Sequence, residues 1–438
     1  MLSPQRLKPV FRHLKVPKMK VHDFPVASRI DAIPASIWYK YSNLARETGA
    51  VNLGQGFSDD VVPEILLRQL QEVSKNSKAT IHQYPPGAGH PVLTSILAEI
   101  YTELLGWKVD AQKNIVVTVG AQHALYYAFL SFISEGDNVI VIEPAFDCYA
   151  TQIRIAGGNP IGIPLREETS DGERKTENFR IDFEKLEEVL KTNQVKALVL
   201  NNPHNPIGKV FSREELEKIG DLAEEYNFFV ISDEVYEYQV LDKPMIRFAS
   251  LPNMAKRTIT VGSGGKCFNC TGWKLGWAIA PSNFIDPIKK IHGQATFCCS
   301  TPLMVALGQT FAEDFSVTKK NASESYLMSK MPTTLKAKRD KLVNALSEAG
   351  FDVVIPEGGI FIIANYKNVW DNVDPKNPEK ADEQFVEWLT VEKNLAAIPI
   401  SPFYLTDEVE TNYVRFCFNK SDEVLDAAVE ILRNLKKN

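Results

Sequence analysis

The sequence predicts an α/β protein, in which a mainly parallel mixed sheet flanked by helices is joined to a smaller α+β domain. Apolar runs of strand length alternate with helical segments from residue 115 onward, which is typical of a parallel sheet covered on both faces. After Pro302 the pattern changes to long helices and a few separated strands. We expect an N-terminal arm with part of the small domain over 21–60, a large domain over 61–310 and the small domain over 311–438.

Local patterns predict each element in order. Strands are expected where aliphatic residues run together and end at Gly, Pro, Asn or Asp, at 51–53, 115–120, 138–144, 161–164, 196–203, 228–234 and 258–261. Helices are expected at 65–73, 91–105, 121–133 and 182–191, and another follows the strand at 138–144 and ends at 156. A further helix is expected from 212, where Ser212 and Glu215 form a capping-box pattern. Further strands are expected within 353–365, 396–401 and 414–418, with helices near 383–389 and at the C-terminus.

Composition limits the classes of function. The chain has 438 residues, of which 44% are hydrophobic and 24% charged, as is ordinary for a globular protein. The net charge of -6 argues against nucleic acid or an anionic membrane as a partner. No apolar run reaches the roughly 18 residues that a membrane-spanning helix needs.

The first twenty residues form a separate pattern. They carry basic side chains and no acidic one, with apolar residues at helical spacing. This is typical of a mitochondrial presequence, although Pro9 interrupts the helix. A disordered basic tail is the alternative, and Met19 offers a second start. We therefore expect a cytoplasmic or mitochondrial location, or both.

Five residues mark the ends of predicted strands, namely Gly120, Pro144, Asn201, Asp233 and Ser263. Ligands of open α/β sheets bind beyond the carboxyl ends of the strands. We therefore expect these five positions to converge on one site.

The chain is organised around the stretch from Thr258 to Pro281. A strand at 258–261 is followed by a predicted glycine-rich loop at 262–265 and then by Lys266. Burial favours the neutral amine of a lysine, which is a nucleophile that forms Schiff bases. A phosphate-binding P-loop is excluded, because it would need glycine at Thr260 and Ser or Thr at Cys267. A solvated surface lysine is the alternative for Lys266 taken alone.

Three further residues fit the chemistry of Lys266. Asp233 ends a buried strand, where an unpaired carboxylate is unfavourable unless a cation meets it. Tyr236 follows three residues later, and Asn205 lies on a proline-rich turn at another strand end. Together they suit a pyridine cofactor, whose ring nitrogen a carboxylate keeps protonated and whose aldehyde a lysine holds. The alternative for Asp233, a magnesium-binding acid of an ATPase, lacks a P-loop.

The cysteines suggest another class of protein. Cys267 and Cys270 form a CxxC pair, and Cys298 and Cys299 are adjacent. A zinc site or thioredoxin-like redox chemistry would fit this pattern on paper. A second CxxC at ribbon spacing is missing, so we expect reduced, partly buried thiols and no metal.

Ten blocks in order resemble the fold-type I pyridoxal-phosphate aminotransferases, and within them the kynurenine aminotransferase, glutamine transaminase K and cysteine-S-conjugate β-lyase group. The similarity runs from about Asp31 to the C-terminus. The blocks are VNLGQGF, HQYPPGAGHP, VTVGAQ, EPAFDCY, NNPHNPIGKVFSREEL, ISDEVYE, GSGGKCFNCTGWKLGW, PEGGIFII, AAIPIS and VRFCF.

The resemblance implies an aspartate aminotransferase-like fold, pyridoxal 5'-phosphate as cofactor and a homodimer. It implies transfer of the α-amino group of kynurenine, glutamine or related aromatic or sulfur-containing amino acids to a 2-oxo acid, with kynurenine giving kynurenic acid. Cysteine-S-conjugate β-lyase activity at the same site is the alternative. A cofactor-binding regulator without catalysis is disfavoured, because Lys266, Asp233 and Arg415 are all present.

The resemblance also assigns roles to matching residues. Lys266 would form the Schiff base and later move the proton, Asp233 would pair with the ring nitrogen, and Tyr236 and Asn205 would bond the ring hydroxyl. Phe146 would stack on the ring. The phosphate would be held by Ala121, Gln122, Ser263 and Lys274, and by Tyr84 reaching across from a neighbouring subunit.

The resemblance also implies which residues bind the substrate. Arg415 would pair with the α-carboxylate, helped by Asn201 or Asn205 and the Gly56 backbone, while Trp38 would wall the side-chain pocket. Three positions depart from the family pattern. Cys267-Phe268-Asn269 stands where Thr-Phe-Ser is usual, Gln122 where many members have an aromatic residue, and Cys298 where histidine is frequent.

Overall fold

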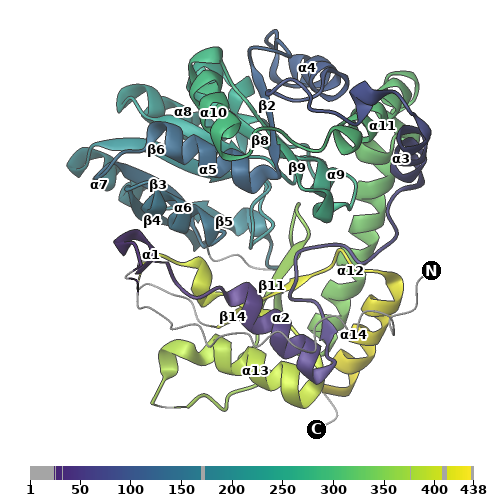
Figure 1. Cartoon of the computed structure of the whole chain (residues 1–438). Coiled ribbons are helices and arrows are strands. Elements are labelled where there is room, and N and C mark those ends of the chain that lie inside the picture. Colours follow the sequence, from purple (N-terminus) through teal and green to yellow (C-terminus); the bar gives the residue numbers. More distant parts are fainter. Residues whose placement is uncertain are drawn as a thin grey trace, which may run out of the picture.

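The computed structural model describes residues 24, 26–31, 33–168, 173–374, 376–406 and 412–435 (Figure 1). The expected presequence or tail over residues 1–20 lies outside the described residues. Among the helices that the structure does describe, none has the length and apolarity to cross a membrane.

In the described part of the chain, the large unit is built on an eight-stranded sheet with the order β2–β9–β8–β7–β6–β3–β4–β5. Its strands are β2 (Ile115–Val119), β3 (Asn138–Glu143), β4 (Asn159–Glu167), β5 (Phe179–Ile181), β6 (Val195–Asn201), β7 (Phe229–Asp233), β8 (Thr258–Ser263) and β9 (Leu275–Ile279). The neighbours from β4 to β8 pair in parallel, whereas β9 runs antiparallel to β2 and β8, and β5 antiparallel to β4. The prediction of a mainly parallel mixed sheet is confirmed.

Helices cover both faces of this sheet, which explains why its strands read as continuous apolar runs. Successive residues of a strand point to opposite faces. Val230 therefore belongs to one apolar cluster and Ile231 to the other. One face carries α5 (Ala121–Phe132), α6 (Cys148–Ile155) and α10 (Ser282–Ala295); the other carries α4 (Pro91–Leu105), α7 (Phe183–Thr192), α8 (Arg213–Glu225) and α11 (Thr301–Lys320).

The start of α8 shows how the sequence fixes a helix end. The Ser212 hydroxyl accepts a hydrogen bond from the Glu215 N–H at 3.2 Å, and the Glu215 carboxylate accepts one from the Ser212 N–H at 3.0 Å. These two bonds satisfy two backbone donors that have no partner within the helix. The predicted capping box is confirmed.

The small unit contains an antiparallel sheet with the order β10–β11–β14–β13 and a parallel pair of β1 with β12. Its strands are β1 (Val51–Asn52), β10 (Asp352–Val354), β11 (Phe361–Asn365), β12 (Leu395–Ala396), β13 (Ile398–Pro399) and β14 (Tyr413–Cys417). The remaining helices are α1 (Ser28–Asp31), α2 (Ile37–Thr48), α3 (Glu64–Lys75), α9 (Gly264–Cys267), α12 (Met331–Glu348), α13 (Ala381–Lys393) and α14 (Asp422–Leu435).

The N-terminal arm packs on the small unit, where α2 contacts α13 (Figure 1, lower part). The expected domain boundary at residue 310 falls inside α11, a helix that packs on α3 and α4. The position of that boundary stays a prediction.

The glycine-rich stretch before Lys266 differs from the predicted loop. Gly262 and Ser263 are the last residues of β8, and Gly264 and Gly265 begin the helical turn α9. A Cβ on Gly262 would lie 2.3 Å from the Trp277 indole nitrogen, and one on Gly264 would lie 2.5 Å from Leu307. These glycines are therefore required by close packing, and the prediction of a loop at 262–265 was wrong.

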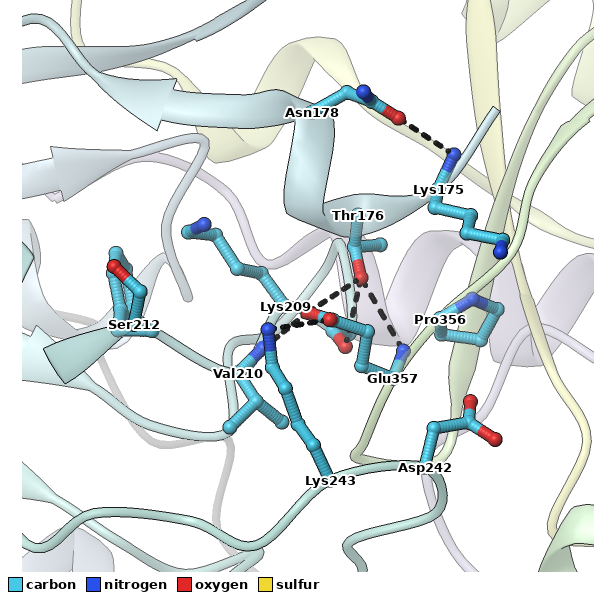
Figure 2. A network of polar contacts seen from close by, with 12 residues as sticks. Lys175, Thr176, Asn178, Lys209, Val210, Ser212, Asp242, Lys243, Pro356 and Glu357 are labelled. Atoms are coloured by element: carbon cyan, nitrogen blue, oxygen red, sulfur yellow. Dashed lines mark hydrogen bonds and ion pairs between the residues drawn. The ribbon is translucent and has the colours of Figure 1, made fainter. Parts of the chain in front are cut away.

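A buried polar junction ties the two units together around Glu357 (Figure 2). The Glu357 carboxylate pairs with the Lys243 ammonium at 2.5 Å and accepts hydrogen bonds from the Thr176 hydroxyl and the Val210 N–H, each at 3.3 Å. The Glu357 N–H in turn donates to the Thr176 hydroxyl at 3.2 Å. Because buried polar groups are costly unless paired, this junction fixes how the turn before β11 meets the loops of the large unit.

Candidate functional site

A cavity of about 520 Å³ lies between the two units, at the carboxyl ends of β6, β7 and β8. The structure brings nearly all of the predicted site residues to its wall. They are Trp38, Gly56, Ala121, Gln122, Phe146, Asn205, Asp233, Tyr236, Ser263, Lys266, Lys274 and Arg415. Four of the five strand-end positions, Gly120, Asn201, Asp233 and Ser263, also line it; Pro144 does not.

Lys266 enters the cavity from α9. Its Nζ donates a hydrogen bond to the Gly56 carbonyl at 2.5 Å and lies 5.3 Å from the ring centroid of Tyr236. Removal of the amine from water lowers its pKa to about 8, and the positive charge of Arg415 acts in the same direction. About a tenth of the amine is therefore neutral at pH 7, far more than at the ordinary lysine pKa of about 10.4, which suits a nucleophile and base.

Asp233 ends β7 and is 3% exposed. Its carboxylate accepts hydrogen bonds from the Tyr149 hydroxyl at 2.6 Å and from the Val235 N–H at 3.3 Å. Burial nevertheless raises the pKa of the carboxyl to about 6. A protonated ring nitrogen reaching this carboxylate would supply the charge that the buried group lacks, so Asp233 fits a pyridinium partner.

Arg415 lies on β14 and is 1% exposed. Its two terminal nitrogens donate to the Asn205 side-chain oxygen at 2.9 Å and to the Gly54 carbonyl at 2.8 Å. Its Nε has no partner among the described residues, and burial lowers the guanidinium pKa to about 10. A buried guanidinium held only by neutral acceptors favours an incoming anion, and its planar shape suits a carboxylate.

One end of the cavity forms a cradle for a second anion. Gly120, with φ of 74°, precedes α5, so Ala121 and Gln122 are the first residues of that helix. Lys274 has a left-handed backbone, and its Nζ would lie 3.3 Å from a Cβ placed on Gly120. Helix N-termini attract anions through unpaired N–H groups and the helix dipole. With Ser263 at the adjacent end of β8, this cradle fits a phosphate group.

Aromatic rings wall the side of the cavity near Arg415. Trp38 lies 5.9 Å from Phe146 between ring centroids, and the Arg415 guanidinium lies 3.9 Å from the ring centroid of Phe361. The Trp38 indole N–H donates to both carboxylate oxygens of Asp147 at 3.1 Å. Two flat apolar surfaces are thus available, one for a planar cofactor and one for a substrate side chain.

Tyr84 is the predicted site residue that the structure leaves outside this cavity. It is 77% exposed and packs edge-on against Phe297, with ring centroids 5.0 Å apart. Its expected role in a neighbouring subunit stays a prediction.

The sequence interpretation missed four residues of the site. Tyr149 bonds Asp233, Asp147 bonds Trp38, Phe361 packs on Arg415, and Gly54 accepts from Arg415. All four lie inside the sequence blocks that resemble the aminotransferases, so a comparison of those blocks could have identified them as site residues. The patterns that predict strands and helices could not have done so.

The cysteine pattern does not lead to a metal site. All six cysteines are free thiols, and Cys267 and Cys270 are buried. Burial raises the pKa of Cys270 to about 12, which disfavours the reactive thiolate. Among the described residues, no group of three or more His, Cys, Asp or Glu side chains is placed to hold a metal ion.

The departures from the family pattern fit their surroundings. Cys267 is fully buried. Asn269 has φ of 51°, a left-handed conformation that asparagine tolerates, and its side chain accepts a hydrogen bond from Asn419 at 3.2 Å. Gln122 contributes its backbone carbonyl, which accepts from Gln152 at 3.2 Å. Of these three residues, Gln122 alone lines the cavity.

Comparison with known proteins agrees with this geometry. Residues 48–432 match the family of class I and II aminotransferases. The chain is 40% identical to human kynurenine–oxoglutarate transaminase 3 over 94% of its length and 90% of that protein, and 37% identical to human kynurenine–oxoglutarate transaminase 1 over 94% and 98%. The crystal structure of YbdL from Escherichia coli, identified with a methionine aminotransferase function, matches with a TM-score of 0.82 and 31% identity over 94% of this chain and all of that one.

Proposed function

Because the chain belongs to the class I and II aminotransferases, we propose that it transfers the α-amino group of kynurenine, glutamine or a related amino acid to a 2-oxo acid, with pyridoxal 5'-phosphate as cofactor. The observation that carries this proposal is the convergence of Lys266, Asp233 and Arg415 on one cavity, although they come from three different strands or helices. The anion cradle at the start of α5 completes the fit.

When bound, pyridoxal phosphate supplies an aldehyde that exchanges the amino group and a pyridine ring that takes up electrons. When the cofactor binds, Lys266 would hold its aldehyde and Asp233 its ring nitrogen. Phe146 would pack against the ring, while Tyr236 and Asn205 would bond its hydroxyl. The phosphate would be held at the start of α5 by Ala121, Gln122, Ser263 and Lys274.

Lys266 is the proposed acid–base group. Its Nζ takes the proton from the substrate α-carbon and later returns a proton, and an amine with a pKa of about 8 can do both near neutral pH. The Gly56 carbonyl accepts a hydrogen bond from this nitrogen and orients it. The carboxylate of Asp233 keeps a proton on the ring nitrogen, because burial strengthens the attraction between the two charges.

Arg415 provides the part of the site that every substrate uses. Amino acid donors and 2-oxo acid acceptors share a carboxylate beside the reacting carbon, so one guanidinium serves both halves of the reaction. The rings of Phe361, Trp38 and Phe403 lie within 5.2 Å of the guanidinium and shield it from water. Loss of water strengthens the ion pair with the substrate.

Kynurenine is the proposed donor because the two human relatives carry kynurenine in their names and the pocket wall is aromatic. Trp38 and Phe146 present rings against which a planar substrate side chain can pack. Transfer of its amino group would lead to kynurenic acid. The cysteine-S-conjugate β-lyase alternative is not favoured, since the relatives named above are transaminases.

We also propose a homodimer. Large apolar side chains remain exposed on the described surface, including Val61 at 83% and Phe297 at 57%. The exposed ring of Tyr84 packs edge-on against Phe297. This exposed aromatic pair is the surface at which we expect the partner subunit to pack.

The test is a direct assay of the purified chain with pyridoxal phosphate, kynurenine and a panel of 2-oxo acids, with kynurenic acid measured by chromatography. We expect product with at least one acceptor and none with the Lys266→Ala variant. Binding of the cofactor without amino transfer from kynurenine to any of the 2-oxo acids would contradict the proposal.

A further inference from the structure

A segment between β1 and α3, residues 54–60, contributes Gln55, Gly56 and Phe57 to the wall of the cavity, and we call it the strap. Three of its carbonyl oxygens accept hydrogen bonds from three cationic side chains. The contacts are Arg415 Nη2 to Gly54 at 2.8 Å, Lys266 Nζ to Gly56 at 2.5 Å and Lys420 Nζ to Phe57 at 2.9 Å. The first two cations belong to the proposed reaction, whereas the third has no role in it so far.

Lys420 carries its ammonium group at a buried position, which is unusual for a lysine. It lies between β14 and α14 and is 1% exposed. Its ammonium is 3.8 Å from the Asp59 carboxylate, beyond hydrogen-bond distance, and 4.4 Å from the ring centroid of Phe57. The Phe57 carbonyl is therefore its close acceptor. Burying an ammonium is costly unless acceptors compensate it, so the contact ties Lys420 tightly to the strap.

A second buried lysine fixes the backbone of Lys420. Lys338 of α12 donates to the Lys420 carbonyl at 2.6 Å and forms an ion pair with Asp60. The Ser421 N–H also donates to the Asp59 carboxylate at 2.6 Å. The strap is thus attached to one corner of the small unit through the Phe57 carbonyl and through its two acidic side chains, Asp59 and Asp60.

The strap has little room to move without disturbing the site. A Cβ on Gly56 would lie 2.7 Å from the Phe361 ring, whose centroid is 3.9 Å from the Arg415 guanidinium. Gly56 and Phe57 both line the cavity. A displacement at Phe57 would therefore reach the Gly56 carbonyl, which accepts from Lys266, and change the rim of the cavity.

We propose that Lys420 is a positioning residue of this transaminase, which holds the strap through the Phe57 carbonyl and so orients the Lys266 amine through the Gly56 carbonyl. The inference rests on the proposed function, in which Lys266 is the acid–base group. The charge of Lys420 has a second effect, because it helps lower the pKa of Lys266, after the larger contribution of desolvation.

Four variants separate the contributions of the contact. Lys420→Met removes hydrogen bond and charge, Lys420→Gln keeps a donor without charge, and Lys420→Arg keeps both. Lys341→Met is the matched control, since Lys341 pairs with Asp426 on the surface at 2.6 Å. In the apoprotein, acetylation of Lys266 by acetic anhydride is followed against pH by peptide mass spectrometry. In the cofactor-loaded protein, kcat and KM are measured for one donor and one acceptor.

For Lys420→Met we expect the midpoint of Lys266 acetylation to move to higher pH, because a nearby positive charge is lost. We also expect kcat/KM to fall about tenfold or more for donor and acceptor alike, the scale of one lost charged hydrogen bond. Lys420→Gln should recover part of kcat/KM while keeping the shifted midpoint. Lys420→Arg should approach the parent protein in both acetylation midpoint and kcat/KM, and Lys341→Met should match the parent in both quantities.

An acetylation profile and a kcat/KM in Lys420→Met equal to those of Lys341→Met would overturn the inference. If Lys420→Met does not fold, Lys420→Gln decides, because an acetylation profile and a kcat/KM in that variant equal to those of Lys341→Met also refute the inference. Failure of the proposed function looks different, since the parent would then transfer no amino group while the acetylation profiles still report on the strap.

Discussion

Lys266 combines two properties that a solvated lysine lacks, namely a fixed acceptor at Gly56 and a pKa lowered to about 8 by desolvation. Only the neutral amine attacks the cofactor aldehyde. We therefore predict that the rate of cofactor capture by the apoprotein rises about tenfold per pH unit below pH 8 and levels off above it, because the neutral fraction does so. Stopped-flow absorbance at several pH values measures this rate. A midpoint near the ordinary lysine value would contradict it.

Asp233 offers a second test, because its carboxylate is buried beside Tyr149. In Asp233→Asn an uncharged amide cannot keep a ring nitrogen protonated. We expect kcat to fall by about two orders of magnitude or more, as several kcal/mol of charge stabilisation disappear, while cofactor still binds. Single-turnover kinetics with visible absorbance measure both. If kcat of Asp233→Asn is close to that of the parent protein, the role of Asp233 is structural and not catalytic.

Arg415 should affect all substrates equally, because its contact ignores the side chain. Each charged hydrogen bond contributes about 1.5–3 kcal/mol, so Arg415→Ala should lower kcat/KM by roughly a hundredfold or more for donors and acceptors. Arg415→Lys should recover only part, since an ammonium lacks the planar fork. Steady-state kinetics with two donors and two acceptors test this. A loss confined to one substrate would show a different role.

At the scale of elements, two glycines make a matched pair. Gly262 lies in β8, where a Cβ would be 2.3 Å from Trp277, while a Cβ on Gly293 of α10 would meet no atom within 4 Å. We expect Gly262→Ala to destabilise the fold by about 1–3 kcal/mol through overpacking. Gly293→Ala should stabilise it by about 0.5–1 kcal/mol through helix propensity. Urea unfolding of both apoproteins measures these changes, and equal effects would contradict the packing argument.

The strands and helices that the sequence predicted are those whose patterns are local. The apolar run before Asp233 and the capping box at Ser212 need only a few neighbouring residues, and both were predicted. The hydrogen bond from Arg415 to the Gly54 carbonyl joins positions 361 residues apart, and no local pattern contains it. The glycines at 262–265 were misread for the same reason, since Trp277 of β9 and Leu307 of α11, which contact two of them, are distant in sequence.

At the scale of the whole molecule, the cavity takes its walls from both units, with Asp233 and Lys266 from the large one and Arg415 and Trp38 from the small unit and the arm. The quoted blocks could predict which residues meet. They could not predict how Glu357 and Lys420 hold the units and the strap in place, because those contacts depend on the packed fold.

The proposed homodimer gives the last prediction, which concerns Tyr84. Because Tyr84 is 77% exposed and outside its own chain's cavity, we expect it to complete the site of a partner subunit. Tyr84→Ala and Lys266→Ala should each have low activity alone. When the two variants are mixed after reversible dissociation, about half of the dimers that form should contain one subunit of each variant. One site of each such dimer has both residues intact, so about a quarter of all sites should recover activity.

If Tyr84 acts within its own chain, no site of a mixed dimer is intact and no activity returns. Light scattering confirms dimers throughout, and an active monomer would also contradict the prediction.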